Sequence, residues 1–220
     1  MQRANSIQTF IETGTYRGEP SAWAAKYFAE VITIEYAETL YEAARQRFQV
    51  IPHVRVLHGH SGVELAKLVP KLSAMSIFWL DSHWSGGETY GSDDECPLMD
   101  ELQAIMDSPF QHCILIDDAR LFLSTPQLPH NPSAWPSISD IVVVLRKEPH
   151  LYEIFVIEDN IIAVPPGLKP YLTTYCQRVN TEAWRRYGEE NSQNGLVRGL
   201  RMMRQGLELV AAGIIDRVRS

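Results

Sequence analysis

An acidic glycine turn near the start of the sequence has the residue types and spacing of a nucleoside site. Glu12-Thr13-Gly14-Thr15-Tyr16-Arg17-Gly18 follows an apolar segment, and Glu35 ends a second apolar segment about twenty residues later. Such a turn lets the backbone approach a ligand closely, and an acid after the next strand suits a ribose diol. Because Tyr16 stands where a dinucleotide site has its middle glycine, we expect a nucleoside without phosphates. S-adenosylmethionine is the obvious candidate.

Further polar residues follow the later apolar segments. They are Gly59-His60-Ser61, Asp81-Ser82-His83 and Asp117-Asp118. In an open α/β sheet, ligands bind at the carboxyl ends of the strands, so we expect these residues to gather at one edge. Carboxylates held this close repel one another unless cations or protons offset their charge. A cationic sulfonium and a divalent metal ion would both do so.

The segments that carry these residues alternate between strand and helix patterns. Short apolar runs predict strands, and apolar residues at helical spacing predict helices. We expect strands at 9–12, 31–35, 54–57, 77–80 and 113–116, and helices at 20–28, 37–48, 62–69, 97–106 and 138–147. Repeated βα units with apolar strands predict an α/β protein whose mostly parallel sheet is covered by helices on both faces.

The pattern changes after these units. Segments 152–157 and 161–164 flank a short turn, which predicts an antiparallel hairpin at the sheet edge. We expect residues 1–167 to form one domain and residues 168–220 a helical C-terminal extension. The extension is predicted to hold a short helix around 181–187 and a second helix from about 196 to 219. An apolar stripe on the second helix indicates docking or homo-oligomer formation; it comprises Leu196, Leu200, Met203, Leu207 and Val210.

Five parallel strands finished by a hairpin, with these acids at the strand ends, resemble class I S-adenosylmethionine-dependent methyltransferases. The nearest pattern is that of metal-dependent O-methyltransferases of the catechol and macrocin types, over roughly residues 9–165. The resemblance implies a Rossmann-like methyltransferase fold. It also implies biosynthetic methyl transfer to a hydroxyl of a small-molecule or sugar-containing metabolite, assisted by Mg²⁺.

The resemblance also assigns residues. It implies that Glu35 holds the ribose hydroxyls, that Ser61 lies beside the adenine, and that Asp81, Asp117 and Asp118 are the metal ligands. Oxygen ligands suit Mg²⁺. The full set expected to bind the cofactor is Glu12, Gly14, Thr15, Tyr16, Gly18, Glu35, Tyr36, Gly59, His60, Ser61 and Asp81.

The expected general base departs from the catechol-type pattern. Those enzymes have a lysine three residues after the acid of the fourth strand, and this sequence has Trp84 there. We therefore expect His83 to act as the base together with Asp81, since an unperturbed imidazole pKa of about 6.5 suits proton abstraction. Two alternatives remain open: a metal-free methyltransferase that uses His83, and a non-catalytic binding or scaffold protein with the same fold. A dinucleotide oxidoreductase is disfavoured by Tyr16 and by the hairpin.

Composition narrows the partners and the compartment. The 220 residues carry a net charge of −7, which disfavours nucleic acid as a partner. Three cysteines without metal-type spacing predict reduced thiols and a cytoplasmic protein. No apolar run approaches the ~18 residues of a membrane span, so no membrane partner is expected. Because the first strand begins close to the start of the sequence, we expect any lid to come from 82–95, from 120–137, from the C-terminal extension or from a second subunit.

Overall fold

Seven strands form one mixed sheet within the part of the chain that the computed structural model describes, residues 7–84, 94–191, 195–196, 199–200 and 202–204. The strand order is β3-β2-β1-β4-β5-β7-β6, and β7 runs antiparallel to both of its neighbours. The strands are β1 Thr9–Thr13, β2 Glu30–Glu35, β3 Val54–His58, β4 Ile77–Leu80, β5 Cys113–Ile116, β6 Glu153–Ile157 and β7 Asn160–Val164. The predicted parallel sheet and its terminal hairpin are therefore confirmed.

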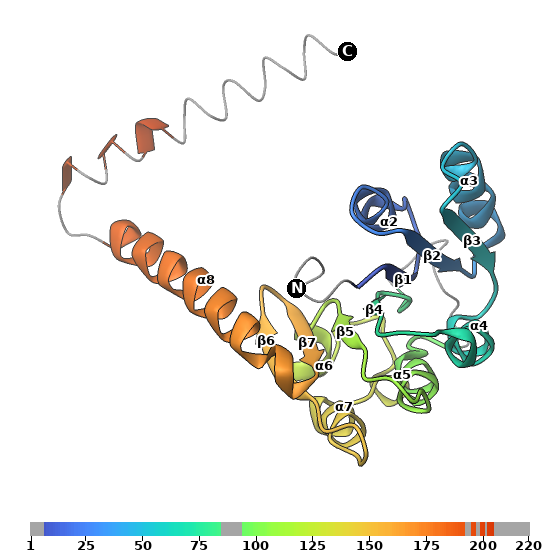
Figure 1. Cartoon of the computed structure of the whole chain (residues 1–220). Helices are drawn as coiled ribbons and strands as arrows, with labels where there is room; N and C mark the ends of the chain where they lie inside the picture. The colour runs from blue at the N-terminus through green and yellow to red at the C-terminus, as the bar shows by residue number, and fades with distance from the viewer. Residues whose placement is uncertain (1–6, 85–93, 192–194, 197–198, 201, 205–220) are drawn as a thin grey trace, which may run out of the picture. The chain divides into compact units, whose positions relative to one another are not determined.

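Helices cover both faces of this sheet (Figure 1). α2 and α3 lie on one face of the sheet, and α4, α5 and α7 lie on the other. The strand order reverses after β3, and because the crossovers between parallel strands are right-handed, this reversal puts the later helices on the opposite face. The helices are α2 Glu19–Ala24, α3 Glu38–Phe48, α4 Ser61–Leu68, α5 Leu98–Met106, α6 Arg120–Leu123 and α7 Ile138–Leu145. Short 3₁₀ turns complete the connections: η1 Val69–Lys71, η2 Pro132–Ala134 and η3 Pro166–Leu168.

The main apolar core lies between the sheet and the α4, α5 and α7 layer. Ile11, Phe78 and Ile114 occupy one register row across three adjacent strands, and all three are fully buried. Leu102 of α5 belongs to the same buried cluster. Because successive side chains of a strand point to opposite faces, Glu12 points away from this core and toward α2. The alternation in β1 thus places Ile11 in this core and Glu12 on the face that α2 covers.

A buried polar cluster surrounds His112, directly before the first residue of β5. His112 is fully buried; its Nδ1 accepts the Ser76 N–H at 3.1 Å, and its Nε2 lies 2.8 Å from the Ser108 hydroxyl. The Tyr152 hydroxyl accepts the His112 N–H at 3.0 Å. Burial, followed by the nearby His150, lowers the pKa of His112 to about 4. The imidazole is therefore neutral in the folded protein over most of the pH range.

We expect this cluster to make the protein less stable in mild acid. Below pH ~6.5 the unfolded chain protonates His112, whereas the folded chain does so only near pH 4, so the free energy of unfolding falls as the pH falls between these values. The contribution lost is about 3 kcal/mol. Urea unfolding of the wild type and of His112→Asn at several pH values measures it. Groups that do not interact with His112 titrate alike in both proteins and cancel in the difference, so an unchanged difference between pH 7 and pH 4.5 would contradict this expectation.

The C-terminal extension differs from its prediction. A short helix around 181–187 is wrong, because α8 runs without interruption from Lys169 to Glu190. Pro170 fits its first turn, where the missing N–H has no helical acceptor. The residues that follow are rich in β-branched and aromatic side chains, which are weak helix formers, so propensity alone does not indicate a helix there. The chain divides into two compact units, Met1–Tyr171 and Leu172–Ser220.

The predicted docking stripe is described only in part. Leu196, Leu200 and Met203 are 73%, 56% and 61% exposed, whereas Leu207 and Val210 lie outside the described residues. Homo-oligomer formation through this segment stays a prediction. None of the helices described has both the length and the apolar character needed to cross a membrane. All three cysteines are free thiols.

Candidate functional site

The carboxyl ends of the central strands are held in register beyond their last residues. The Asp81 N–H donates to Thr13 O at 3.1 Å, the Asp117 N–H donates to Leu80 O at 3.1 Å, and the Gly59 N–H donates to Glu35 O at 3.0 Å. Asp81 and Asp117 are therefore each fixed by a neighbouring strand, and the turn after β3 is fixed by β2. The predicted gathering of the strand-end residues at one edge follows from this register.

The first turn is shaped by two glycines with left-handed backbones. Gly14 has φ 78° and Gly18 has φ 71°. A Cβ on Gly14 would lie 2.1 Å from the Asp81 carbonyl oxygen, and one on Gly18 would lie 2.9 Å from the Phe48 ring. Tyr16, between them, also has a positive φ of 45° and is half exposed. The glycine spacing noted in the sequence is thus required by the approach of this turn to β4 and α3.

Glu35 ties the first turn to the second strand. Its buried carboxylate accepts the Tyr16 N–H on Oε2 and the Ala37 N–H on Oε1, each at 2.9 Å. Each carboxylate oxygen can accept a further hydrogen bond. Tyr16, which carries the first of these amides, and Tyr36, which precedes the second, have rings that are about half exposed. The arrangement can hold a diol beside two aromatic faces.

Glu12 lies beneath this turn on the α2 side of the sheet. One carboxylate oxygen accepts hydrogen bonds from the Ser21 and Thr33 hydroxyls, both at 2.6 Å, and Thr15 is hydrogen bonded to Thr33 at 2.6 Å. The other oxygen, Oε1, is buried and has no hydrogen-bond partner among the residues described. Burial raises the pKa of Glu12 to about 7 against the opposing effect of the two hydroxyls. An unsatisfied buried acceptor is costly, so Oε1 is suited to a donor from a ligand.

The turn after β3 brings His60 and Ser61 beside the turn after β4. His60 Nε2 lies 3.2 Å from an Asp94 carboxylate oxygen, and the His60 ring is nearly perpendicular to that of Tyr36. The Ser61 hydroxyl lies 3.1 Å from that of Ser82. These contacts place both residues with Tyr36 and the β4 turn at the same end of the sheet.

Glu101, a buried acid beside the Ser61–Ser82 pair, was not predicted from the sequence. Ser82 donates a hydrogen bond of 2.6 Å to Glu101 of α5, whose side chain is fully buried. Burial raises the pKa of Glu101, against the hydrogen bonds from Ser61 and Ser82. A signal did exist, because Glu101 stands three residues after Leu98 and one before Leu102, on the inward stripe of its helix.

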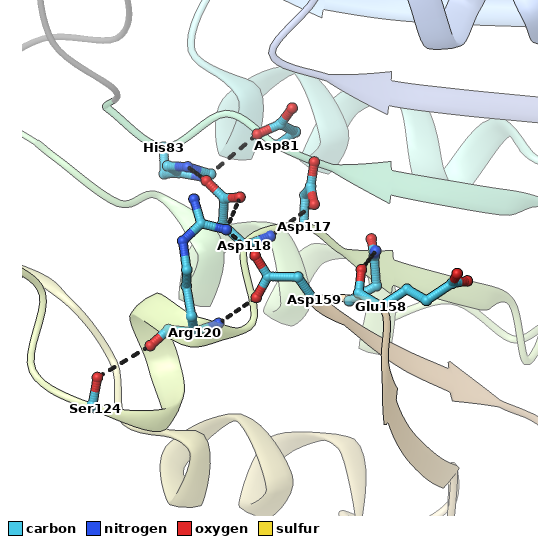
Figure 2. Close-up of polar contacts among 9 residues, drawn as sticks. Asp81, His83, Asp117, Asp118, Arg120, Ser124, Glu158 and Asp159 are labelled. Atoms are coloured by element: carbon cyan, nitrogen blue, oxygen red, sulfur yellow. Dashed lines mark hydrogen bonds and ion pairs between the residues drawn. The ribbon is translucent and has the colours of Figure 1, made fainter. Parts of the chain in front are cut away.

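A chain of charged groups joins the end of β4 to the end of β5 and to the hairpin turn, as Figure 2 shows. His83 Nδ1 lies 3.5 Å from Asp81 Oδ1, and His83 Nε2 lies 3.0 Å from Asp118 Oδ2. Arg120 donates to Asp118 Oδ1 at 2.7 Å and is paired through the same nitrogen with Asp159. Asp81 and His83 were predicted together, whereas Arg120 and Asp159 were not.

Asp81, His83 and Asp118 differ in exposure and charge. The Asp81 side chain is 34% exposed and that of His83 is 6% exposed, so Asp81 is the group that a ligand can reach. Burial raises the pKa of Asp81 to about 7, against the attraction of His83. Burial would lower the pKa of His83, but the hydrogen bond to Asp118 and the charge of Asp81 raise it overall. The hydrogen bond from His83, with help from Arg120, lowers the pKa of Asp118.

The three predicted metal ligands lie at adjacent strand ends but do not fit a divalent ion as they are paired. Asp118 uses one oxygen for His83 and the other for Arg120. Asp117 Oδ1 accepts the Asp118 N–H at 2.8 Å. Across the described ranges, no group of three or more histidine, cysteine, aspartate or glutamate side chains is arranged to hold a metal ion.

The loop after β5, one of the expected lid segments, is partly anchored in the core. Trp135 is buried and donates a 2.8 Å hydrogen bond from Nε1 to Glu95 Oε2. The Asn131 N–H donates to the same carboxylate at 3.0 Å. Burial would raise the pKa of Glu95, but these hydrogen bonds lower it overall. Part of the other expected lid segment, residues 85–93, lies outside the described residues.

Several solved structures have an architecture similar to that of this chain. No protein-family model matches the chain, and a search of curated proteins gives no match. Similar solved structures include a Staphylococcus aureus protein provisionally named a caffeoyl-CoA O-methyltransferase, with TM-score 0.54 and 17% identity, covering 74% of this chain and 78% of that one. The SAH-bound methyltransferase PaMTH1 of Podospora anserina has TM-score 0.53 and 16% identity, over 74% of each chain. An O-methyltransferase from Bacillus cereus in complex with SAH has TM-score 0.50 and 17% identity, over 74% and 76%.

At identities this low, the structural similarity shows the fold alone. The strand order, the antiparallel β7 and the helical layers are those of the Rossmann-like, class I S-adenosylmethionine-dependent methyltransferase fold. The predicted fold class is therefore confirmed.

Proposed function

We propose that this protein transfers a methyl group from S-adenosylmethionine to a hydroxyl of a small molecule. The observation that carries the proposal is the placement of Glu35 and Asp81 at the same edge of the sheet, after β2 and β4. Glu35 is fixed by two backbone N–H groups, and Asp81 is backed by His83. One carboxylate is thus suited to a ribose and the other to a reacting hydroxyl.

The residues of the first two turns would hold the cofactor. Glu35 would accept the ribose hydroxyls, and Tyr16 and Tyr36 offer exposed rings beside it. The unpartnered Oε1 of Glu12 would accept a hydrogen bond from the cationic end of the cofactor. S-adenosylmethionine, when bound, supplies an electrophilic methyl group on a sulfonium. The acidic rim suits that positive charge.

The proton of the acceptor hydroxyl would go to Asp81. Asp81 is the exposed member of its pair with His83, and its pKa of about 7 is suitable for a base at neutral pH. His83, held by Asp118, would stabilise the Asp81 carboxylate from behind. The imidazole therefore supports Asp81 instead of meeting the substrate itself.

Assistance by Mg²⁺, which the resemblance implied, is not part of this proposal. Asp118 is committed to His83 and Arg120, so no complete ligand set is ready. We expect methyl transfer to persist in excess EDTA and to be unaffected by added Mg²⁺. Assays with a radiolabelled methyl donor and a panel of hydroxylated acceptors measure this, and activity that EDTA abolishes and Mg²⁺ restores would refute it.

The free cysteines support the expected cytoplasmic location.

Titration calorimetry with S-adenosylhomocysteine tests the binding half of the proposal. We expect saturable binding, which a scaffold that merely shares the fold would lack. Glu35→Gln should weaken that binding by roughly 10–100-fold, because a charged acceptor of several hydrogen bonds is worth about 1.5–3 kcal/mol.

A matched variant controls for the loss of an acid near this loop. Glu38→Gln changes an exposed acid at the start of α3, three residues further along the chain. It should leave the affinity unchanged. Equal affinities of the two variants would remove Glu35 from the ribose site.

A further inference from the structure

Arg120 places a positive charge beside Asp118, one of the three strand-end acids. Its guanidinium is paired with Asp118 and Asp159, and its backbone N–H donates to Asp159 Oδ1 at 2.9 Å (Figure 2). Asp118 lies at the end of β5, and Asp159 lies in the turn between β6 and β7. One arginine therefore links two acids that are 41 residues apart in the sequence.

The hairpin turn is shaped to present Asp159 to this arginine. Glu158 and Asp159 have φ of 48° and 63°, a left-handed conformation that is unfavourable for residues other than glycine. Asp159 also accepts the Ala119 N–H on its carbonyl oxygen at 2.7 Å. Positive φ at both central residues is what a two-residue type I′ hairpin loop requires, and Ile157 pairs with Asn160 directly across this loop. The turn places Asp159 beside the backbone and the guanidinium at the start of α6.

Both oxygens of Asp118 already meet a donor. His83 uses Oδ2 and Arg120 uses Oδ1, at 3.0 and 2.7 Å. A divalent ion binds carboxylate oxygens directly, so on Asp118 it would have to share an oxygen with the imidazole or the guanidinium. A metal ion that shared Asp118 with Arg120 would also be repelled by the guanidinium.

We propose that Arg120 is a positioning residue whose guanidinium replaces a divalent ion at this site, holding Asp118 and, through it, His83. The site is then independent of metal because the chain supplies the cation. The inference rests on the proposed function for the reaction served, but metal binding can be measured without any reaction.

Binding of Mn²⁺, followed by electron paramagnetic resonance, tests the inference on the full chain. The wild type should bind no stoichiometric Mn²⁺ at this edge. Arg120→Gln removes the cation and should bind Mn²⁺ at least about tenfold more tightly than the wild type. Adding Asp118→Asn to that variant should abolish the gain, and Arg120→Lys, which keeps the charge, should show none.

Arg55→Gln is the matched control, because Arg55 forms an exposed pair with Glu30 at 3.2 Å in a different part of the sheet. It should bind Mn²⁺ as the wild type does. A wild type that binds one equivalent of Mn²⁺ would overturn the inference without any variant, and so would an Arg120→Gln protein that shows no gain. Absence of S-adenosylhomocysteine binding would instead refute the proposed function and leave the Mn²⁺ result to decide the role of Arg120.

Discussion

Asp81→Asn is expected to lower the rate of methyl transfer by about 10²–10⁴-fold, the usual contribution of a positioned general base. Asparagine has nearly the same shape but cannot take a proton from the acceptor hydroxyl. Asp81 is the exposed end of the Asp81–His83–Asp118 chain, so its loss removes the contact with the acceptor while His83 stays bound to Asp118. Single-turnover rates with a radiolabelled methyl donor measure the effect.

Two further measurements make this expectation specific. Affinity for S-adenosylhomocysteine should change little, because the proposed ribose contact belongs to Glu35. Asp107→Asn changes an exposed acid after α5 and should leave the rate unchanged. If Asp81→Asn keeps its rate within about threefold of the wild type, Asp81 is not the base.

Gly14→Ala is expected to cause the largest loss of stability, at least about 3 kcal/mol. Its Cβ would lie 2.1 Å from the carbonyl oxygen of Asp81, which belongs to the backbone and cannot rotate away. Alanine is also strained at φ 78°. Relief requires β1 and the end of β4 to separate, so the site should be lost with the stability. Urea unfolding at an unchanged m-value measures the loss.

Gly167→Ala provides the matched comparison. Among the described residues, and apart from its two chain neighbours, no atom lies within 4 Å of a Cβ at Gly167. This substitution should therefore change the stability by no more than about 1 kcal/mol. Equal stabilities of the two variants would show that β1 and β4 tolerate a wider separation than the structure has. The same result would weaken the argument that Gly14 sets the position of Asp81.

The sequence by itself determined the sheet and the acids at the carboxyl ends of its strands. The predicted strands 77–80 and 113–116 agree with β4 and β5, because a buried strand of a parallel sheet is a nearly continuous apolar run with distinct ends. Where such runs end, polar residues begin, so Glu35 and Asp81 could be assigned to strand ends. Local periodicity is enough for this assignment.

Only the tertiary structure decided which side chains these acids meet. Asp118 is paired with His83, 35 positions away, and Arg120 is paired with Asp159, 39 positions away. No periodic pattern relates such positions, since the pairing depends on strand register and on the left-handed hairpin turn. The long helix α8 was likewise hidden by residues of weak helix propensity. Strand positions follow from burial along the chain, whereas ion-pair partners follow from distances in space, and our proposal for Arg120 rests on those distances.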